Sequence, residues 1–173
     1  DETLAKDPRI IPNLLKLEQT MNPPCDYFKT IQTEIKPLMR RIVTNWMCEI
    51  CDEQKCEYQV LPLAINYMDR FLCLKPITTS QFQLLAAVCL LLASKVRQSH
   101  YLTSDLLIYY ADNCVTKKDL LNWEILVLTT LEWLLTAPTS YDFIQHIAER
   151  VPWGRENINI IRHALTLNSV CQT

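Results

Sequence analysis

The stretch MRRIVTNW, residues 39–46, carries apolar side chains at positions i, i+3, i+4 and i+7. This spacing follows the 3.6-residue period of an α-helix, so the four side chains lie on one face. The four residues are Met39, Ile42, Val43 and Trp46. The stretch therefore predicts an amphipathic helix with a defined apolar face.

The composition of the rest of the chain also favours helices. Of 173 residues, 49% are hydrophobic, and the only glycine is Gly154. The Asn-Gly and Asp-Gly turns that join antiparallel strands are therefore absent. The expected fold class is all-α.

Apolar periodicity and capping residues indicate where the helices lie. Pro37 suits the first position of a helix. Thr103 can cap a short helix, and Thr116 with Asp119 approximates a capping box. The segment Ala137-Pro138-Thr139 is the expected hinge, because proline disfavours helix at the preceding residue. The predicted helices cover residues 11–20, 37–51, 60–72, 80–96, 103–110, 116–135, 139–150 and 155–171, with one or two further turns within 27–35.

Charge and hydropathy disfavour two classes of partner. The formal net charge is −2 and the pI is near 5.9, so no excess of basic residues is left to neutralise a phosphate backbone. The longest apolar run, residues 84–93, has ten residues, whereas a membrane-spanning helix needs about 20. We expect neither nucleic acid nor a membrane as partner, and we expect this run to form a helix buried on all sides.

The eight cysteines are expected to be reduced thiols. A disulfide scaffold is typical of short chains, whereas this chain is long and apolar. Cys48, Cys51 and Cys56 have a loose metal-like spacing, but no histidine lies near them in the sequence. Because a free cysteine packs like a small hydrophobic residue, packing is the expected role of these three.

Two further stretches, LAINYMDRFL at residues 63–72 and LASK at residues 92–95, follow the first at characteristic distances. With these three stretches the chain resembles the cyclin family, most closely the D-type (G1) cyclins. The resemblance implies a five-helix cyclin fold, the cyclin box, over residues 37–136. It also implies an N-terminal extension with a short helix over residues 1–36, and the two-helix beginning of an incomplete second cyclin repeat over residues 137–173.

Lys95 and Glu124 are candidates for binding a partner. Lys95 follows the buried apolar run, and Glu124 lies on a predicted helix. Charges close to a core are usually paired or directed at a partner, and spacing alone leaves both interpretations open. In cyclins the matching lysine and glutamate hydrogen-bond main-chain groups of a cyclin-dependent kinase, beside the mobile helix of its N-terminal lobe. The resemblance therefore implies that Lys95 and Glu124 are the kinase-binding residues.

The apolar face of residues 39–46 also has two interpretations. It is either core or, because Leu38, Met47 and Ile50 widen the apolar surface, partly exposed to a partner. The resemblance implies a shallow groove that docks substrate or inhibitor peptides containing Arg-x-Leu, with the leucine in the groove and Glu49 attracting the basic part. A solvated surface glutamate is the alternative interpretation of Glu49. The implied substrate-docking patch consists of Met39, Ile42, Val43, Trp46, Gln83 and Glu49.

Arg40 and Asp69 have a different implied role. In the cyclin pattern the matching residues form an ion pair that bridges the first two helices of the box inside the fold. A buried pair of this kind is structural, because removing one partner leaves an uncompensated charge. We therefore expect this pair to stabilise the fold rather than to bind a partner.

No catalytic set can be assembled from the sequence. His100, His146 and His163 are scattered along the chain, and there is no glycine-rich phosphate loop. No nucleophile has an assignable base. We expect no enzymatic activity, no metal site and no cofactor.

The resemblance implies a regulatory subunit that binds and activates a cyclin-dependent protein kinase in G1/S control of the cell cycle. Its implied substrates belong to the retinoblastoma family, and its implied location is the nucleus and the cytoplasm. Two alternatives are a kinase-binding decoy that does not activate and a cyclin-fold transcription factor. The lack of excess basic charge disfavours the transcription factor.

Two expectations concern the ends of the chain. D-type cyclins usually carry Leu-x-Cys-x-Glu near the N-terminus for docking the retinoblastoma pocket, and no such sequence occurs here. The start at Asp1 suggests that this segment was removed. If the second repeat is incomplete, the apolar face of residues 158–171 is expected to be only partly covered.

Overall fold

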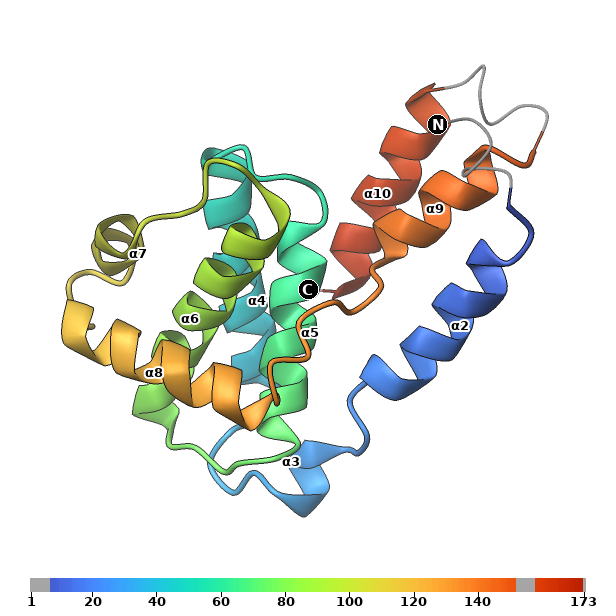
Figure 1. Cartoon of the computed structure of the whole chain (residues 1–173). Coiled ribbons are helices and arrows are strands. Elements are labelled where there is room, and N and C mark those ends of the chain that lie inside the picture. Colours follow the sequence, from blue (N-terminus) through green and yellow to red (C-terminus); the bar gives the residue numbers. More distant parts are fainter. Residues whose placement is uncertain (1–6, 152–157, 173) are drawn as a thin grey trace.

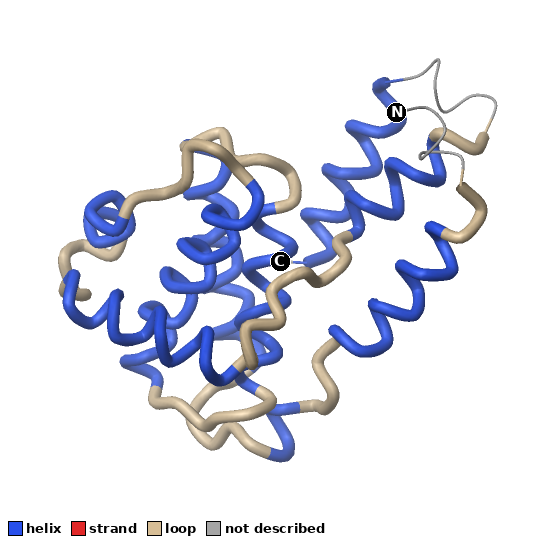
Figure 2. The backbone as a smooth tube through the Cα atoms, viewed as in Figure 1, coloured by secondary structure: helices blue, strands red, loops and turns tan. Residues whose placement is uncertain are grey.

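The structure is a computed structural model that describes residues 7–151 and 158–172. Within these residues the regular elements are helices, which confirms the predicted all-α class (Figures 1 and 2). The helices are α2 (Ile10–Met21), α3 (Tyr27–Thr30), α4 (Pro37–Glu53), α5 (Val60–Leu72), α6 (Thr79–Arg97), α7 (Ser104–Tyr110), α8 (Lys117–Thr130), α9 (Ser140–Ala148) and α10 (Ile158–Gln172).

Helix α6 is the centre of the fold. Every residue from Leu85 to Ser94 is buried, and the helix packs against α4, α5, α7 and α8 (Figure 1). Among the described residues, α6 is also the one helix long and apolar enough to cross a membrane. However, 61% of its apolar window is buried inside the protein. This burial is that of a core helix, because neighbouring helices take the place of lipid.

Polar caps fix several helix starts where the sequence predicts them. The backbone N–H of Leu106 donates to Thr103 Oγ1 at 3.3 Å, which caps α7. The backbone N–H of Asp119 donates to Thr116 Oγ1 at 3.1 Å, which caps α8. Each cap satisfies a backbone donor that has no partner within its helix. Pro37 stands at the start of α4, as expected.

Helix α8 ends at Thr130, five residues before the predicted end at 135. The expectation was wrong because the apolar pattern continues beyond the helix, whereas the backbone turns: Glu132 and Trp133 have φ of 53° and 60°. Two side chains of α5 bind this turn. The hydroxyl of Tyr67 donates to the carbonyl of Leu135 at 2.5 Å, and Arg70 Nη1 donates to that of Leu134 at 2.8 Å. These tertiary bonds satisfy carbonyls that would otherwise belong to the helix.

Helices α2, α9 and α10 form a second group beside the main bundle (Figure 1). Helix α9 packs against α2 and α10, and α10 also contacts α5. Leu165 of α10 is buried, whereas Leu167 and Val170 are 66% and 68% exposed. The apolar side of α10 is thus only partly covered, as expected.

Candidate functional site

Lys95 and Glu124 lie together at the surface. Lys95 stands in the last turn of α6 and Glu124 on the facing side of α8. Lys95 Nζ donates to Glu124 Oε1 at 2.5 Å, and the side chains are 37% and 12% exposed. Lys95 Nζ also lies 5.9 Å from the centroid of the Tyr101 ring, within cation–π distance. The packing of α6 on α8 therefore brings two residues 29 positions apart into one ion pair.

Exposed apolar side chains lie close in sequence to both residues of this ion pair. Val96 follows Lys95, and Tyr101 contacts it. Leu121 and Ile125 flank Glu124 on α8 at a spacing of four residues, so they share one helix face. All four are exposed. Exposed apolar side chains that cluster on a surface mark interaction sites, so these four are candidate partner contacts. None of these four residues was predicted from the sequence as a contact, although the i, i+4 spacing of Leu121 and Ile125 was a usable signal.

A groove of about 320 Å³ lies between α4 and α6. Ile42 is 59% exposed, whereas Met39, Val43 and Trp46 are partly buried against the core. The indole N–H of Trp46 donates to the carbonyl of Tyr110 at 3.3 Å, which ties α4 to the end of α7. The groove is lined by Met39, Ile42, Val43, Trp46, Thr79, Phe82 and Gln83.

The groove therefore contains five of the six residues of the implied docking patch. Glu49 is exposed on α4 and does not line the groove. Thr79 and Phe82 were missed, although Thr79 stands three positions before Phe82 and four before Gln83 and so neighbours both on α6. The bottom of the groove is Phe82, which is 2% exposed. This arrangement can accept an apolar side chain.

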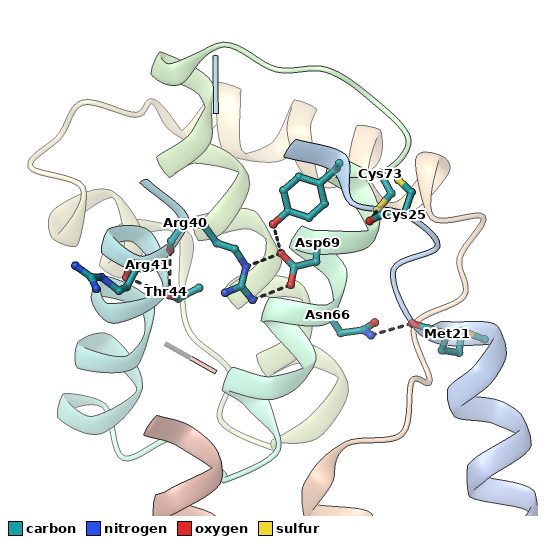
Figure 3. Close-up of polar contacts among 9 residues, drawn as sticks. Met21, Cys25, Arg40, Arg41, Thr44, Asn66, Asp69 and Cys73 are labelled. Carbon is teal, nitrogen blue, oxygen red and sulfur yellow. Dashed lines mark hydrogen bonds and ion pairs between the residues drawn. The ribbon is translucent and has the colours of Figure 1, made fainter. Parts of the chain in front are cut away.

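Arg40 and Asp69 form a bidentate ion pair between α4 and α5 (Figure 3). Arg40 Nε donates to Asp69 Oδ1 at 2.9 Å and Nη2 donates to Oδ2 at 2.8 Å. The Tyr27 hydroxyl of α3 donates to the same Oδ1 at 2.7 Å. The carboxylate of Asp69 raises the pKa of the Arg40 guanidinium, so the arginine stays charged. Three helices thus converge on one largely buried carboxylate.

Two buried tyrosines, Tyr27 and Tyr67, are expected to make the stability of the fold depend on alkaline pH. Burial raises the pKa of Tyr27 and of Tyr67 well above the usual 10.0, and the carboxylate of Asp69 adds to the effect at Tyr27. The unfolded chain loses these protons at lower pH than the folded chain does. The contribution of these two tyrosines to the free energy of unfolding is therefore fully present below about pH 10. It is lost as the pH rises beyond that value.

Thermal melts from about pH 8 to about pH 11 should show a falling melting temperature above about pH 10. In Tyr27→Phe the fall should be shallower, because only the contribution of Tyr67 remains from this pair. A wild-type melting temperature that stays constant across this range would contradict the prediction.

Candidate metal ligands and the three histidines are distributed as follows in the described part of the chain. There, no group of three or more histidine, cysteine, aspartate or glutamate side chains could hold a metal ion. His100 follows α6, His146 lies in the last turn of α9, and His163 lies on α10. The structure thus leaves the three histidines on separate elements.

Helices α4 to α8 form a bundle that carries the Lys95–Glu124 ion pair and the apolar groove. A comparison with protein families shows to which family this chain belongs. The family model described as "Cyclin, N-terminal domain" matches residues 9–136. The chain belongs to the cyclin family. Cyclins are non-catalytic regulatory subunits of kinases.

Individual cyclins are similar to this one over its whole length. The G1/S-specific cyclin-D2 of Gallus gallus is 46% identical over 174 residues, and the G1/S-specific cyclin-D1 of Homo sapiens is 45% identical. Each alignment covers 100% of this chain, and 60% and 59% of the relative. The resemblance to D-type cyclins is confirmed, and the chain spans about 60% of the length of the curated relatives it matches.

The cyclin fold is confirmed by a solved structure. The viral cyclin of herpesvirus saimiri superposes with a TM-score of 0.77 at 27% sequence identity. The superposition covers 92% of this chain and 68% of the viral one. It therefore extends beyond the family match into the helices that follow residue 136.

Proposed function

We propose that this cyclin is a regulatory subunit that binds and activates a cyclin-dependent protein kinase in G1/S control. Its similarity to proteins named G1/S-specific cyclins supports the proposal. The observation that carries it is the Lys95–Glu124 pair within a surface of exposed apolar side chains. These two residues are the proposed kinase contacts.

The chemistry of the pair suits main-chain recognition. An ammonium group has three donors, and the hydrogen bond from Lys95 to Glu124 uses one of them. Lys95 can therefore donate to main-chain carbonyls of a kinase while it keeps Glu124. The second carboxylate oxygen of Glu124 can accept a main-chain N–H. The exposed apolar side chains around the pair would supply buried area and exclude water from these bonds.

Activation would be a population shift in the kinase. A cyclin that binds the active position of the mobile kinase helix better than the inactive one moves the equilibrium toward the active state. That position completes the lysine–glutamate pair of the kinase that positions the ATP phosphates. The cyclin supplies rigid geometry, and α6 and α8 provide it because both pack into the core.

The groove between α4 and α6 is the proposed docking site for Arg-x-Leu peptides of substrates or inhibitors. Its apolar lining and the buried Phe82 at its base suit a leucine side chain. Glu49 lies one turn beyond Trp46 on α4, where its exposed carboxylate can attract the basic part of such a peptide. Docking beside the kinase would raise the effective concentration of a substrate.

Replacing Ile42 by aspartate should weaken binding of an Arg-x-Leu peptide by about tenfold or more, since burying a leucine side chain contributes about 1.5–3 kcal/mol. Leu38→Asp is the matched control, because Leu38 lies on the same helix, is 57% exposed and does not line the groove. Fluorescence anisotropy with a labelled peptide measures the difference. Equal affinities for the two variants would argue against this site.

The remaining assignments follow from the family. We infer a division into an extension over residues 1–36, a cyclin box over 37–136 and the beginning of a second repeat over 137–173. The end of the family match at residue 136 supports the second boundary. Similarity to D-type cyclins supports an intracellular protein, for which we propose the nucleus and the cytoplasm, with substrates of the retinoblastoma family.

Two measurements test the proposal. The first is calorimetric titration of this chain into a kinase subunit of the D-cyclin partner class. The second is an activity assay of the complex on a retinoblastoma-derived peptide. Binding with activation is the expected result. Binding without activation would identify a decoy instead. Absence of kinase binding, together with salt-dependent binding of duplex DNA, would identify a transcription factor.

A further inference from the structure

The C-terminal end of α4 brings two cysteines together. Lys55 has a φ of 52°, in the left-handed region that commonly ends a helix. The backbone N–H of Cys56 then donates to the carbonyl of Cys51 at 2.9 Å. This is the six-residue bond of a Schellman motif, in which the first and last residues commonly make a side-chain contact. In this chain both positions of that contact are cysteines.

The two thiols differ in how readily they ionise. Interaction with Cys56 and burial raise the pKa of Cys51, whereas interaction with Cys51 lowers the pKa of Cys56. The lowered pKa favours the thiolate at Cys56, and the thiolate is the nucleophilic form of cysteine. Cys51 is buried and Cys56 is half-buried.

The half-buried sulfur can be reached from solvent. A cavity of about 410 Å³ is lined by Cys51, Lys55 and Cys56, and also by Leu165 and Asn168 of α10. A small peroxide fits such a space. Cys89, by contrast, is fully buried and does not line this cavity.

A second pair of thiols, Cys25 and Cys73, provides an internal comparison (Figure 3). The Cys73 thiol donates to the carbonyl of Cys25 at 3.5 Å. Burial raises the pKa of Cys73 to about 11, which suppresses its thiolate. Of the two pairs, only the one at the end of α4 combines a stabilised thiolate with a cavity.

We propose that Cys51 and Cys56 form a dithiol modification site, which hydroperoxides convert to an intramolecular disulfide. The Cys56 thiolate attacks a peroxide oxygen and breaks the O–O bond, which gives a sulfenic acid and releases water or an alcohol after protonation. The Cys51 sulfur then attacks the Cys56 sulfur. The S–S bond forms as hydroxide leaves and takes the Cys51 proton as water. Two thiols lose two electrons in total, and the peroxide gains them.

Peptide mapping of the native chain after treatment with hydrogen peroxide tests the site. Trypsin cleaves after Lys55, between the two cysteines, so a Cys51–Cys56 disulfide joins peptides 42–55 and 56–70. We expect this linked pair to be the main oxidised product at the lowest oxidant doses, and dithiothreitol to separate it. A main product that joins Cys25 to Cys73, or oxidation of only the exposed Cys114 and Cys171, would overturn the proposal.

Three variants assign the linked sulfurs. Cys51→Ala and Cys56→Ser should each lose the linked pair. Cys48→Ala should keep it, although Cys48 lies in the same tryptic peptide as Cys51. Circular dichroism checks that each variant is folded. Because Cys56 is only half-buried, Cys56→Ser should stay folded and tests the site even if Cys51→Ala unfolds. A linked pair that persists in Cys56→Ser, or that disappears in Cys48→Ala alone, would refute the assignment.

Discussion

Replacing Lys95 and Glu124 together by alanine is expected to abolish kinase activation and to leave the helical content unchanged. Both side chains of the ion pair are removed, so no unpaired charge remains at the α6–α8 contact. Anchoring residues of an interface contribute about 2–4 kcal/mol each when truncated. The affinity for the kinase should therefore fall by at least about 100-fold. Calorimetry measures this fall, and circular dichroism measures the helical content.

The matched control is the exposed pair Asp105 and Lys117. These residues join α7 to α8 at 3.0 Å, and their side chains are 74% and 58% exposed. An exposed pair contributes little to stability, and neither of these residues is a proposed kinase contact. The double alanine variant of this pair should activate like the wild type. Full activation by the variant of Lys95 and Glu124 would refute the proposed kinase contacts.

Replacing Arg40 by alanine is expected to destabilise the whole fold. The variant leaves the Asp69 carboxylate largely buried with the Tyr27 hydroxyl as its remaining side-chain partner from this network. Breaking a buried ion pair from one side costs about 3–5 kcal/mol. For a chain of this length the melting temperature should fall by roughly 6–20 °C.

Arg41→Ala is the control for this prediction, because Arg41 is the next residue on α4 and is exposed (Figure 3). It should change stability by no more than about 0.5 kcal/mol. The double variant of Arg40 and Asp69 should lose less than the sum of the two single losses, because the pair acts as a unit. Additive losses, or an Arg40→Ala variant as stable as Arg41→Ala, would show that the network contributes little. Scanning calorimetry measures all four proteins.

The helices were predictable because their causes are local. The start of α8 follows from Thr116 and Asp119, which are three positions apart. The end of α8 was not predictable, because Tyr67 and Arg70 determine it from a different helix. No sequence window around residues 131–135 contains those donors. Tertiary hydrogen bonds of this kind override the local pattern.

The sequence predicted which residues of α4 share the face of the docking patch, but not how exposed each of them is. The periodicity of residues 39–46 gives a shared face, and it leaves open whether that face is core or surface. The structure gives both answers, since Trp46 packs against the core whereas Ile42 is mostly exposed. Exposure depends on where α6 lies beside α4, and one sequence does not specify that distance. The same limit explains why Phe82 was missed.

The Lys95–Glu124 pair has a consequence for how fast a partner can find this surface. A positive and a negative group at 2.5 Å cancel each other a few ångströms away, and the exposed residues named beside them, Val96, Tyr101, Leu121 and Ile125, are uncharged. Such a surface exerts little long-range attraction, so we expect encounter rates that change little with ionic strength. Discrimination between partners would then lie in the lifetime of each complex, because only a partner that seats against both charges is held.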